Sequence, residues 1–329
     1  MRKILFRADA KPSIGTGDLI SLIELSKRLP QNWKFYFCCR QTNAAQKILK
    51  KRGVEMIHWL EDDMTIEHEK TYLKSIIAED SIDAFIMEIT EISPTEYEGI
   101  GADTYKVCIN FCNDFPNDTD LLVDWSVEAP DWYHVDLYPK IKFLLGAEYV
   151  LIPEEIEKNF HSRPYAQRKI QNILITMGGN DQWNLSLSVL NALQRLKFEG
   201  NIKLVLGAGY MHSEPLQAFI TESELSLDTL NNVPSMAKLY AWADLAIATG
   251  GLTASELVAS RTPALVTAAY PHEESRCKLF RNNGWIEYSG AKNMNSVIIN
   301  KCIKHPPPTA SFFPFKTSEI SNAIQRALK

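Results

Sequence analysis

Short apolar runs alternate with amphipathic segments along the first part of the chain. A buried apolar run predicts a strand, and apolar positions spaced three to four residues apart predict a helix that covers it. Because connections of helical length usually join parallel strands, this alternation indicates a parallel sheet covered on both faces. The predicted elements are strand 3–6, helix 19–29, strand 33–38, helix 44–52, strand 55–59, helix 66–78, strand 82–87 and strand 105–110.

The pattern weakens between residues 111 and 139, where Asp, Asn and Pro are frequent. Short apolar pieces follow at 143–145 and 149–152, and the charged segment 154–169 predicts a linker or a bridging helix. We therefore place a first domain at residues 1–152. Three aromatic residues of the weak region suit either stacking on a sugar or packing in a core: Trp125, Trp132 and Tyr133.

A second alternation predicts a second domain at residues 170–329, whose closing helix, 318–328, can cross back onto the first domain. The fold class is therefore α/β, with two open, doubly wound parallel sheets that face a cleft. The predicted strands of this half are 172–176, 202–206, 245–248 and 264–267, and its predicted helices are 184–196, 213–222, 235–242, 254–260, 274–282 and 318–328.

The segment 247–256 combines a buried strand, a glycine turn and the start of a helix. Gly250 and Gly251 allow a tight turn, and Thr253 can cap the helix that follows. Free N–H groups at such a helix N-terminus suit an anion such as a phosphate. Glu256 then has two interpretations: it accepts hydrogen bonds from a ribose diol, or it is a solvated side chain of an ordinary strand–helix turn.

Composition narrows the classes of function. The formal charge of −5 weighs against a nucleic-acid-binding surface. No apolar run approaches the roughly 18 residues that would span a bilayer, and residues 1–6 are too short for a signal peptide, so we expect a cytoplasmic protein. The six cysteines and seven histidines show no zinc-ligand spacing, so we expect buried free thiols and neither a metal nor a cofactor.

Four motifs are distributed along the chain: ILFRADA at 4–10 with IGTG at 14–17, FLLGAEY at 143–149, ITMGGND at 175–181, and residues 243–256 followed by Pro263 and the segment 270–284. Together they resemble the UDP-sugar hydrolases of the pseudaminic acid pathway and their spore-coat-polysaccharide relatives. The second half is also similar to the bacterial N-acetylglucosaminyltransferase that makes lipid II. The resemblance implies a glycosyltransferase-B-like architecture.

The resemblance also implies a reaction: hydrolysis of a UDP-linked 2,4-diacetamido-2,4,6-trideoxy sugar to UDP and the free sugar, without a metal. The second domain would bind UDP, with Glu256 on the ribose, and the first domain would hold the sugar near the loop that carries Arg7 and Asp9. The diphosphate turns would be Gly178 and Gly179 with Gly250, Gly251, Leu252 and Thr253, and the sugar side would include Gly15 and Gly17.

Three positions depart from the family. Its His after the second loop glycine, the base that activates water, is Asp18 here, and its Asp after the fourth strand is Glu88. Its Asn-Gln pair is His272 and Glu273, which the resemblance places near the sugar and the leaving group. His272 suits either stabilisation of the leaving diphosphate or a polar rim position.

Asp18 keeps three interpretations: a helix cap, a general base for water, or a general base for a sugar or lipid hydroxyl. The last is similar to the heptosyltransferases, whose first helix also opens with Gly-Asp. A UDP-sugar hydrolase is the first expectation, because the RAD loop is peculiar to that family. The alternatives are an inverting glycosyltransferase with Asp18 as base and a non-catalytic nucleotide-sugar binder.

Overall fold

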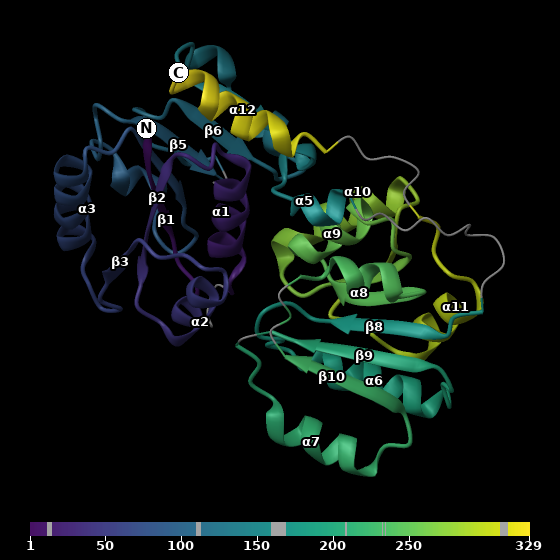
Figure 1. Cartoon of the computed structure of the whole chain (residues 1–329). Helices are drawn as coiled ribbons and strands as arrows, with labels where there is room; N and C mark the ends of the chain where they lie inside the picture. Colours follow the sequence, from purple (N-terminus) through teal and green to yellow (C-terminus); the bar gives the residue numbers. More distant parts are fainter. Residues whose placement is uncertain are drawn as a thin grey trace. The chain divides into compact units, whose positions relative to one another are not determined.

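The computed structural model describes residues 1–11, 15–109, 113–158, 169–207, 209–231, 233, 235–309 and 315–329. Ile14 of the IGTG motif, Cys112 and residues 159–168 of the predicted linker lie outside this description. The chain forms two compact units, one from Met1–Leu151 with Pro314–Lys329 and the other from Ile152–Phe313. Each unit is built on its own sheet (Figure 1).

The first unit contains a seven-stranded sheet of order β3-β2-β1-β4-β5-β6-β7, in which neighbouring strands are parallel. Its strands are β1 (Lys3–Ala8), β2 (Lys34–Arg40), β3 (Ile57–Leu60), β4 (Ala84–Glu88), β5 (Tyr105–Ile109), β6 (Leu121–Asp124) and β7 (Lys142–Leu145). Its helices are α1 (Gly17–Arg28), α2 (Asn43–Lys51), α3 (Ile66–Asp80), α4 (Ala129–Trp132) and α12 (Thr317–Ala327), with 3-10 turns η1 (Pro94–Tyr97), η2 (Val135–Leu137) and η3 (Ala147–Tyr149).

Helices cover both faces of this sheet, with α1 and α3 on opposite sides (Figure 1). Leu5 of β1 and Phe85 of β4 share a core with Leu73 of α3. Because successive side chains of a strand point to opposite faces, Phe6 is directed to the other side of the sheet. Both faces of β1 are therefore buried, which explains its continuous apolar run.

The C-terminal helix α12 belongs to the first unit. The Thr317 hydroxyl donates a hydrogen bond to the carbonyl oxygen of Val150 (2.8 Å), and the Lys316 amide donates to the carbonyl oxygen of Glu148 (2.6 Å). At its other end, Nε of Arg2 donates to the carbonyl oxygen of Leu328 (2.6 Å). These bonds hold α12 at both of its ends.

The second unit contains a six-stranded sheet of order β10-β9-β8-β11-β12-β13, again with parallel neighbours. Its strands are β8 (Asn172–Thr176), β9 (Asn201–Leu206), β10 (Ser226–Asn231), β11 (Leu245–Thr249), β12 (Ala264–Ala268) and β13 (Glu287–Ala291). Its helices are α5 (Glu154–Lys158), α6 (Leu185–Arg195), α7 (Ser213–Glu222), α8 (Ala237–Trp242), α9 (Leu252–Ala259), α10 (Glu274–Asn282) and α11 (Ser296–Lys304), with the 3-10 turn η4 (Pro271–Glu273).

The prediction of two parallel α/β sheets is confirmed. Residues 7–8, predicted as loop, continue β1, because the strand remains paired with both neighbours there. The elements that were not predicted include β6, β10, β13, α4 and α11. Five cysteines are buried free thiols, as predicted: Cys38, Cys39, Cys108, Cys277 and Cys302.

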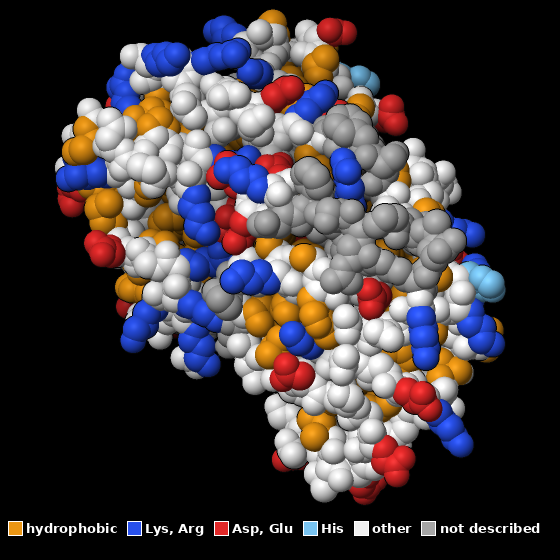
Figure 2. Space-filling view, turned by 45° about the vertical axis from the view of Figure 1, so that its right-hand side comes forward, with side chains coloured by type: hydrophobic (Ala, Val, Ile, Leu, Met, Phe, Trp, Pro, Cys, Tyr) orange, Lys and Arg blue, Asp and Glu red, His pale blue; other side chains and the backbone are white. Residues whose placement is uncertain are grey.

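The surface carries charges of both signs. On the face shown in Figure 2, acidic side chains lie among Lys and Arg side chains. This mixture differs from the one-sign stripe that is typical of a nucleic-acid-binding face. None of the helices that the structure describes has the length and the apolar character needed to span a bilayer.

Candidate active site

The two predicted glycine turns of the second unit meet where its strand order reverses, between β8 and β11. Open α/β sheets bind ligands outside the carboxyl ends of their strands at such a point. Gly178 and Gly179 follow β8, and Gly250 and Gly251 follow β11. A Cβ on Gly178 would lie 3.6 Å from Oγ1 of Thr249, the last residue of β11. The structure therefore brings both turns to one edge of the sheet.

The turns after β8 and β9 each contain a position that requires glycine. Gly178 has a φ of +77°, a conformation that side chains with a Cβ rarely adopt. The amide of Gly209 donates to the carbonyl oxygen of Gly179 (2.9 Å), and a Cβ on Gly207 would collide with the Gly179 backbone. The turns after β8 and β9 are thus packed backbone to backbone.

The helix after Gly250 begins earlier than predicted. Helix α9 starts at Leu252 with Gly251 at its cap position, so Thr253 lies in the first turn and the prediction that it caps the helix is wrong. Glu256 is half-buried, and the hydroxyl of Tyr240 donates a hydrogen bond to its Oε2 (2.5 Å). Burial raises the pKa of Tyr240, so this hydroxyl keeps its proton and orients the Glu256 carboxylate.

The structure places Glu273 at the same glycine turn. Its Oε2 accepts hydrogen bonds from the amides of Ala269 (2.7 Å) and Tyr270 (3.4 Å), and the amide of Gly250 also donates to its carboxylate. A Cβ on Gly251 would lie 3.2 Å from Oε1 of Glu273. The carboxylate of Glu273 is therefore held by backbone amides of the nucleotide turn, and its expected contact with a sugar stays a prediction.

His272 lies on the surface beside this turn. Its ring stacks on that of Tyr270, with ring centroids 5.7 Å apart and 7° between the ring planes. Desolvation and the positive charge of Arg276 lower the pKa of His272, so the imidazole is neutral at neutral pH. A neutral ring adds no positive charge to a leaving diphosphate, which favours the rim interpretation.

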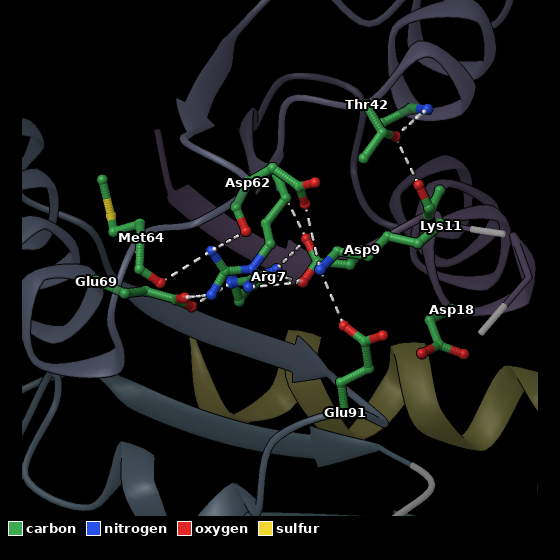
Figure 3. A network of polar contacts seen from close by, with 12 residues as sticks. Arg7, Asp9, Lys11, Asp18, Thr42, Asp62, Met64, Glu69 and Glu91 are labelled. Atoms are coloured by element: carbon green, nitrogen blue, oxygen red, sulfur yellow. Dashed lines mark hydrogen bonds and ion pairs between the residues drawn. The ribbon is translucent and has the colours of Figure 1, made fainter. Parts of the chain in front are cut away.

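In the first unit the strand order reverses between β1 and β4, and acidic residues gather there. Asp9 follows β1, Glu88 ends β4, and Glu91 lies three residues further on. Asp18 projects from the first turn of α1 toward them, as Figure 3 shows for Asp18, Asp9 and Glu91. Both units thus carry their predicted site residues at a reversal of strand order.

Asp18 is not a helix cap. Helix α1 begins at Gly17 and its cap position is Thr16, so the cap interpretation is wrong. The carboxylate of Asp18 instead accepts a hydrogen bond from the hydroxyl of Thr90 (3.0 Å), just beyond β4. Burial raises the pKa of Asp18 to about 7, and the negative charges of Asp9 and Glu91 act in the same direction. A carboxylate with this pKa is suited to general-base catalysis near neutral pH.

Glu88 is buried beside Asp18 at the end of β4. The Ser21 hydroxyl, which lies 3.0 Å from the carbonyl oxygen of Asp18, donates a hydrogen bond to Oε2 of Glu88. This bond favours the ionised carboxylate and acts against the effect of burial. Burial and the charge of Asp18 raise the pKa of Glu88 well above its usual range. Glu88 is 1% exposed, and the sugar-side role that the resemblance implies for it stays a prediction.

The substitution Glu88→Gln is expected to weaken a pH dependence of stability. A carboxyl group with a raised pKa in the folded state stabilises the fold below its unfolded pKa, and this stability is lost as the pH rises toward the folded value. The parent's free energy of unfolding should therefore fall between about pH 5 and pH 8 more steeply than that of Glu88→Gln. Urea unfolding measures this. The exposed control Glu96→Gln should keep the parent slope, and equal slopes for all three proteins would contradict a protonated Glu88.

Arg7 lies at the centre of a buried ion-pair network (Figure 3). Its Nε donates to Oε1 of Glu69 (2.7 Å) and its Nη2 to Oδ2 of Asp9 (2.8 Å). Arg40 donates to the other oxygen of Glu69 (2.7 Å), and its amide donates to Asp9 (2.7 Å). Arg7 has no exposed surface and Asp9 is 2% exposed. The two side chains therefore hold the loop after β1 in place, and the catalytic role that was expected of them stays a prediction.

That loop also carries groups that were not predicted. Nζ of Lys11 lies 3.0 Å from a carboxylate oxygen of Glu91 and 3.3 Å from one of Asp62. The backbones of Lys11 and Gly15 exchange two hydrogen bonds (2.8 and 3.0 Å), and Gly15 has a φ of +84°, which suits glycine. The sequence does contain a signal for Lys11, Thr90 and Glu91. They lie just beyond the carboxyl ends of β1 and β4, where a parallel sheet binds its ligand.

Two curated proteins are similar to this chain in sequence, and no family model matches it. MJ1062, an uncharacterized protein of Methanocaldococcus jannaschii, is 24% identical over 280 residues, or 80% of this chain and 55% of that protein. The spore coat polysaccharide biosynthesis protein SpsG of Bacillus subtilis is 28% identical over 120 residues, or 36% of this chain and 35% of that protein. The matched stretches thus span about half or less of these relatives.

Solved structures show the fold. MurG of Acinetobacter baumannii matches 99% of this chain and 100% of its own, with a TM-score of 0.61 and 16% identity. MnaA of S. aureus in complex with UDP matches 100% and 97%, with a TM-score of 0.64 and 12% identity. The UDP-GlcNAc 2-epimerase of Neisseria meningitidis bound to UDP-GlcNAc matches 99% of both chains, with a TM-score of 0.60 and 12% identity. The fold is glycosyltransferase-B-like.

Proposed function

We propose that this protein is a nucleotide-sugar enzyme that binds a UDP-linked sugar and transfers the sugar to an oxygen nucleophile. The observation that carries the proposal is the meeting of two glycine turns and the N-terminus of α9 at the strand-order reversal of the second sheet. Backbone amides and a helix N-terminus suit a diphosphate. Glu256, oriented by Tyr240, is placed one turn further on, where a carboxylate can accept hydrogen bonds from a ribose diol. UDP and UDP-sugars are also what the complexes of MnaA and the epimerase contain.

In this proposal Asp18 is the general base. The nucleophile's oxygen attacks the anomeric carbon while the bond from that carbon to the diphosphate oxygen breaks, and UDP leaves with the bonding electrons. The proton of the nucleophile passes to Asp18. The first unit supports this role, because the pKa of Asp18 lies near 7 and Thr90 orients its carboxylate.

Water is the nucleophile that we propose first, which makes the protein a UDP-sugar hydrolase. The RAD loop resembles the hydrolases of the pseudaminic acid pathway, and the similarity to SpsG points to the synthesis of a surface polysaccharide. The second candidate is an inverting glycosyltransferase. It is favoured by Asp18 itself, because a carboxylate in the first turn of α1 serves equally well as base for an acceptor hydroxyl.

Product analysis separates these candidates. A purified protein that releases free sugar and UDP from a UDP-sugar without an acceptor is a hydrolase, and one that turns over only with an acceptor is a transferase. Binding of UDP without turnover under either condition would reject both. Backbone amides of the glycine turns and the N-terminus of α9 suit a diphosphate without a metal, so we expect activity to survive a chelator. Loss of activity with a chelator and its return with magnesium would contradict that expectation.

The substitution Glu256→Ala is expected to weaken UDP binding by about 1–3 kcal/mol, the usual worth of a hydrogen bond to a charged group. Isothermal titration calorimetry measures the change. Glu287→Ala serves as a matched control, because Glu287 belongs to the same unit and pairs with the exposed Lys301 (2.8 Å). The assignment of the ribose contact is rejected if Glu256→Ala binds UDP as tightly as Glu287→Ala does.

A further inference from the structure

The glycine turn after β11 already binds an anion, the carboxylate of Glu273. Glu273 is 5% exposed, and its carboxylate accepts hydrogen bonds from the backbone amides of Ala269, Tyr270 and Gly250. Its Oε1 lies against Gly251, the cap residue of α9. A nucleotide diphosphate bound at this turn would need the same amide of Gly250 and would lie beside a carboxylate.

Charges of both signs lie near Glu273. On its own helix Arg276 contributes positive charge, and Glu274 contributes negative charge to the same surroundings. The thiol of Cys277 and the phenol of Tyr288 on β13 also face it, and both are neutral because burial raises the pKa of each to about 12. On β11 and α9 the structure places glycine backbone, and not a cation, against the carboxylate.

We propose that Glu273 takes up a proton when a nucleotide diphosphate binds, so that the turn after β11 accepts the diphosphate with a neutral Glu273. The proposal rests on the proposed function, because it concerns the same nucleotide site. A second negative charge at the turn disfavours the ionised carboxylate, and a protonated carboxyl group releases the amide of Gly250 and donates a hydrogen bond to a phosphate oxygen. Thermodynamic linkage then requires that binding weakens as the pH rises.

Burial acts in the same direction before the ligand arrives. It raises the pKa of Glu273 above its usual value, against the opposing hydrogen bonds of Ala269 and Tyr270. The carboxyl group is therefore prepared for protonation by its surroundings, and the approach of a phosphate adds to this effect. Nucleotide binding therefore favours the state in which Glu273 is protonated and the turn has no negative charge of its own.

The test is the pH dependence of UDP binding, measured by calorimetry between about pH 5.5 and pH 8.5, a range that brackets the phosphate pKa near 6. Glu273→Gln removes the charge and keeps an oxygen that can accept the Ala269 amide. We expect it to bind UDP about tenfold more tightly than the parent at the upper end of this range, one pKa unit being tenfold. The difference from the parent should vanish as the pH falls. Since UDP itself titrates equally in every variant, the difference isolates Glu273.

Glu274→Gln is the matched control. Glu274 is the next residue along the chain and pairs with Lys278 (2.8 Å), so this variant loses the same charge one position away. It should keep the parent's affinity and pH dependence. Parent-like behaviour of Glu273→Gln would overturn the inference and leave the proposed function standing. Absence of UDP binding in all three proteins would overturn both.

A measurement on the unaltered protein keeps the test independent of the variant's folding. Calorimetric titration with UDP in two buffers of different ionisation enthalpy gives the number of protons taken up. When they bind UDP, the parent and Glu274→Gln should take up more protons than the change in protonation of UDP alone accounts for. Proton uptake that matches the titration of UDP alone would overturn the inference.

Discussion

The substitution Asp18→Asn is expected to lower turnover of the UDP-sugar by about 10²–10⁴ and to change substrate binding little, since this is the usual contribution of general-base catalysis. Asn keeps the size of the side chain and can still accept the hydrogen bond of Thr90, but it cannot accept a proton. Because the pKa of Asp18 is raised to about 7, the parent's rate should also rise as the pH passes through that value. Asp18→Asn should lose this rise. Single-turnover assays over a range of pH measure both effects.

The control is Asp103→Asn, an exposed carboxylate on the surface of the same unit, which should retain the parent's rate and pH profile. Thermal unfolding of Asp18→Asn at neutral pH should show no loss of stability, because Asp18 does not cap α1 and its raised pKa makes the ionised carboxylate a cost to folding. A parent-like rate in Asp18→Asn would remove the general base from the proposed mechanism. The proposal that the second unit binds a nucleotide would not be affected by that result.

The substitution Glu69→Ala is expected to destabilise the first unit by about 3–5 kcal/mol, the typical cost of removing one partner of a buried ion pair. Glu69 has no exposed surface, and its carboxylate accepts hydrogen bonds from Arg7 (2.7 Å), Arg40 (2.7 Å) and the hydroxyl of Tyr97 (2.6 Å). Without it, two buried guanidinium groups lose their shared anion. Urea unfolding gives the change in the free energy of unfolding.

Glu67→Ala is the matched control, two residues away on α3. The side chain of Glu67 is 75% exposed and pairs with Lys70 (3.1 Å), and exposed pairs of this kind contribute about 0–1 kcal/mol. The chain has two units with tryptophans in both, so the unfolding transition of the first unit must be separated from that of the second. A loss of less than about 1 kcal/mol in Glu69→Ala would contradict a structural role for the network.

Hydrophobic patterning predicted both sheets because most of their strands are buried on both faces. The segment ILIT of β8 and the segment LAIAT of β11 are continuous apolar runs bounded by turns, and such runs can be recognised without tertiary information. The edge strand β10 was missed for the opposite reason. Its residues, SLDTLN, are half-buried or exposed and mostly polar, and they form a strand because β9 offers a free edge.

The candidate site could be predicted in position but not in detail. Asp18, Glu88 and the glycine turns follow strands, so their place at the carboxyl edges of the sheets follows from the alternation of elements. The alternation of elements does not show which of these side chains are buried. Arg7 and Asp9 were expected near a ligand because the family resemblance places their loop beside the sugar, and nothing in that resemblance showed that Glu69, distant in sequence on α3, pairs with Arg7 in the interior. The sequence pattern also does not show where a side chain points, since the carboxylate of Glu273 points back onto backbone amides of its own turn.

The course of the chain through the two units has a consequence for synthesis on the ribosome. The first unit contains residues 1–151 and also α12, whereas the whole second unit lies between them in sequence. A nascent chain can therefore complete the second sheet while the bonds from Thr317 to Val150 and from Arg2 to Leu328 still cannot form. During that interval the surfaces that α12 covers are open to other proteins. The first unit starts earlier and is finished later than the second.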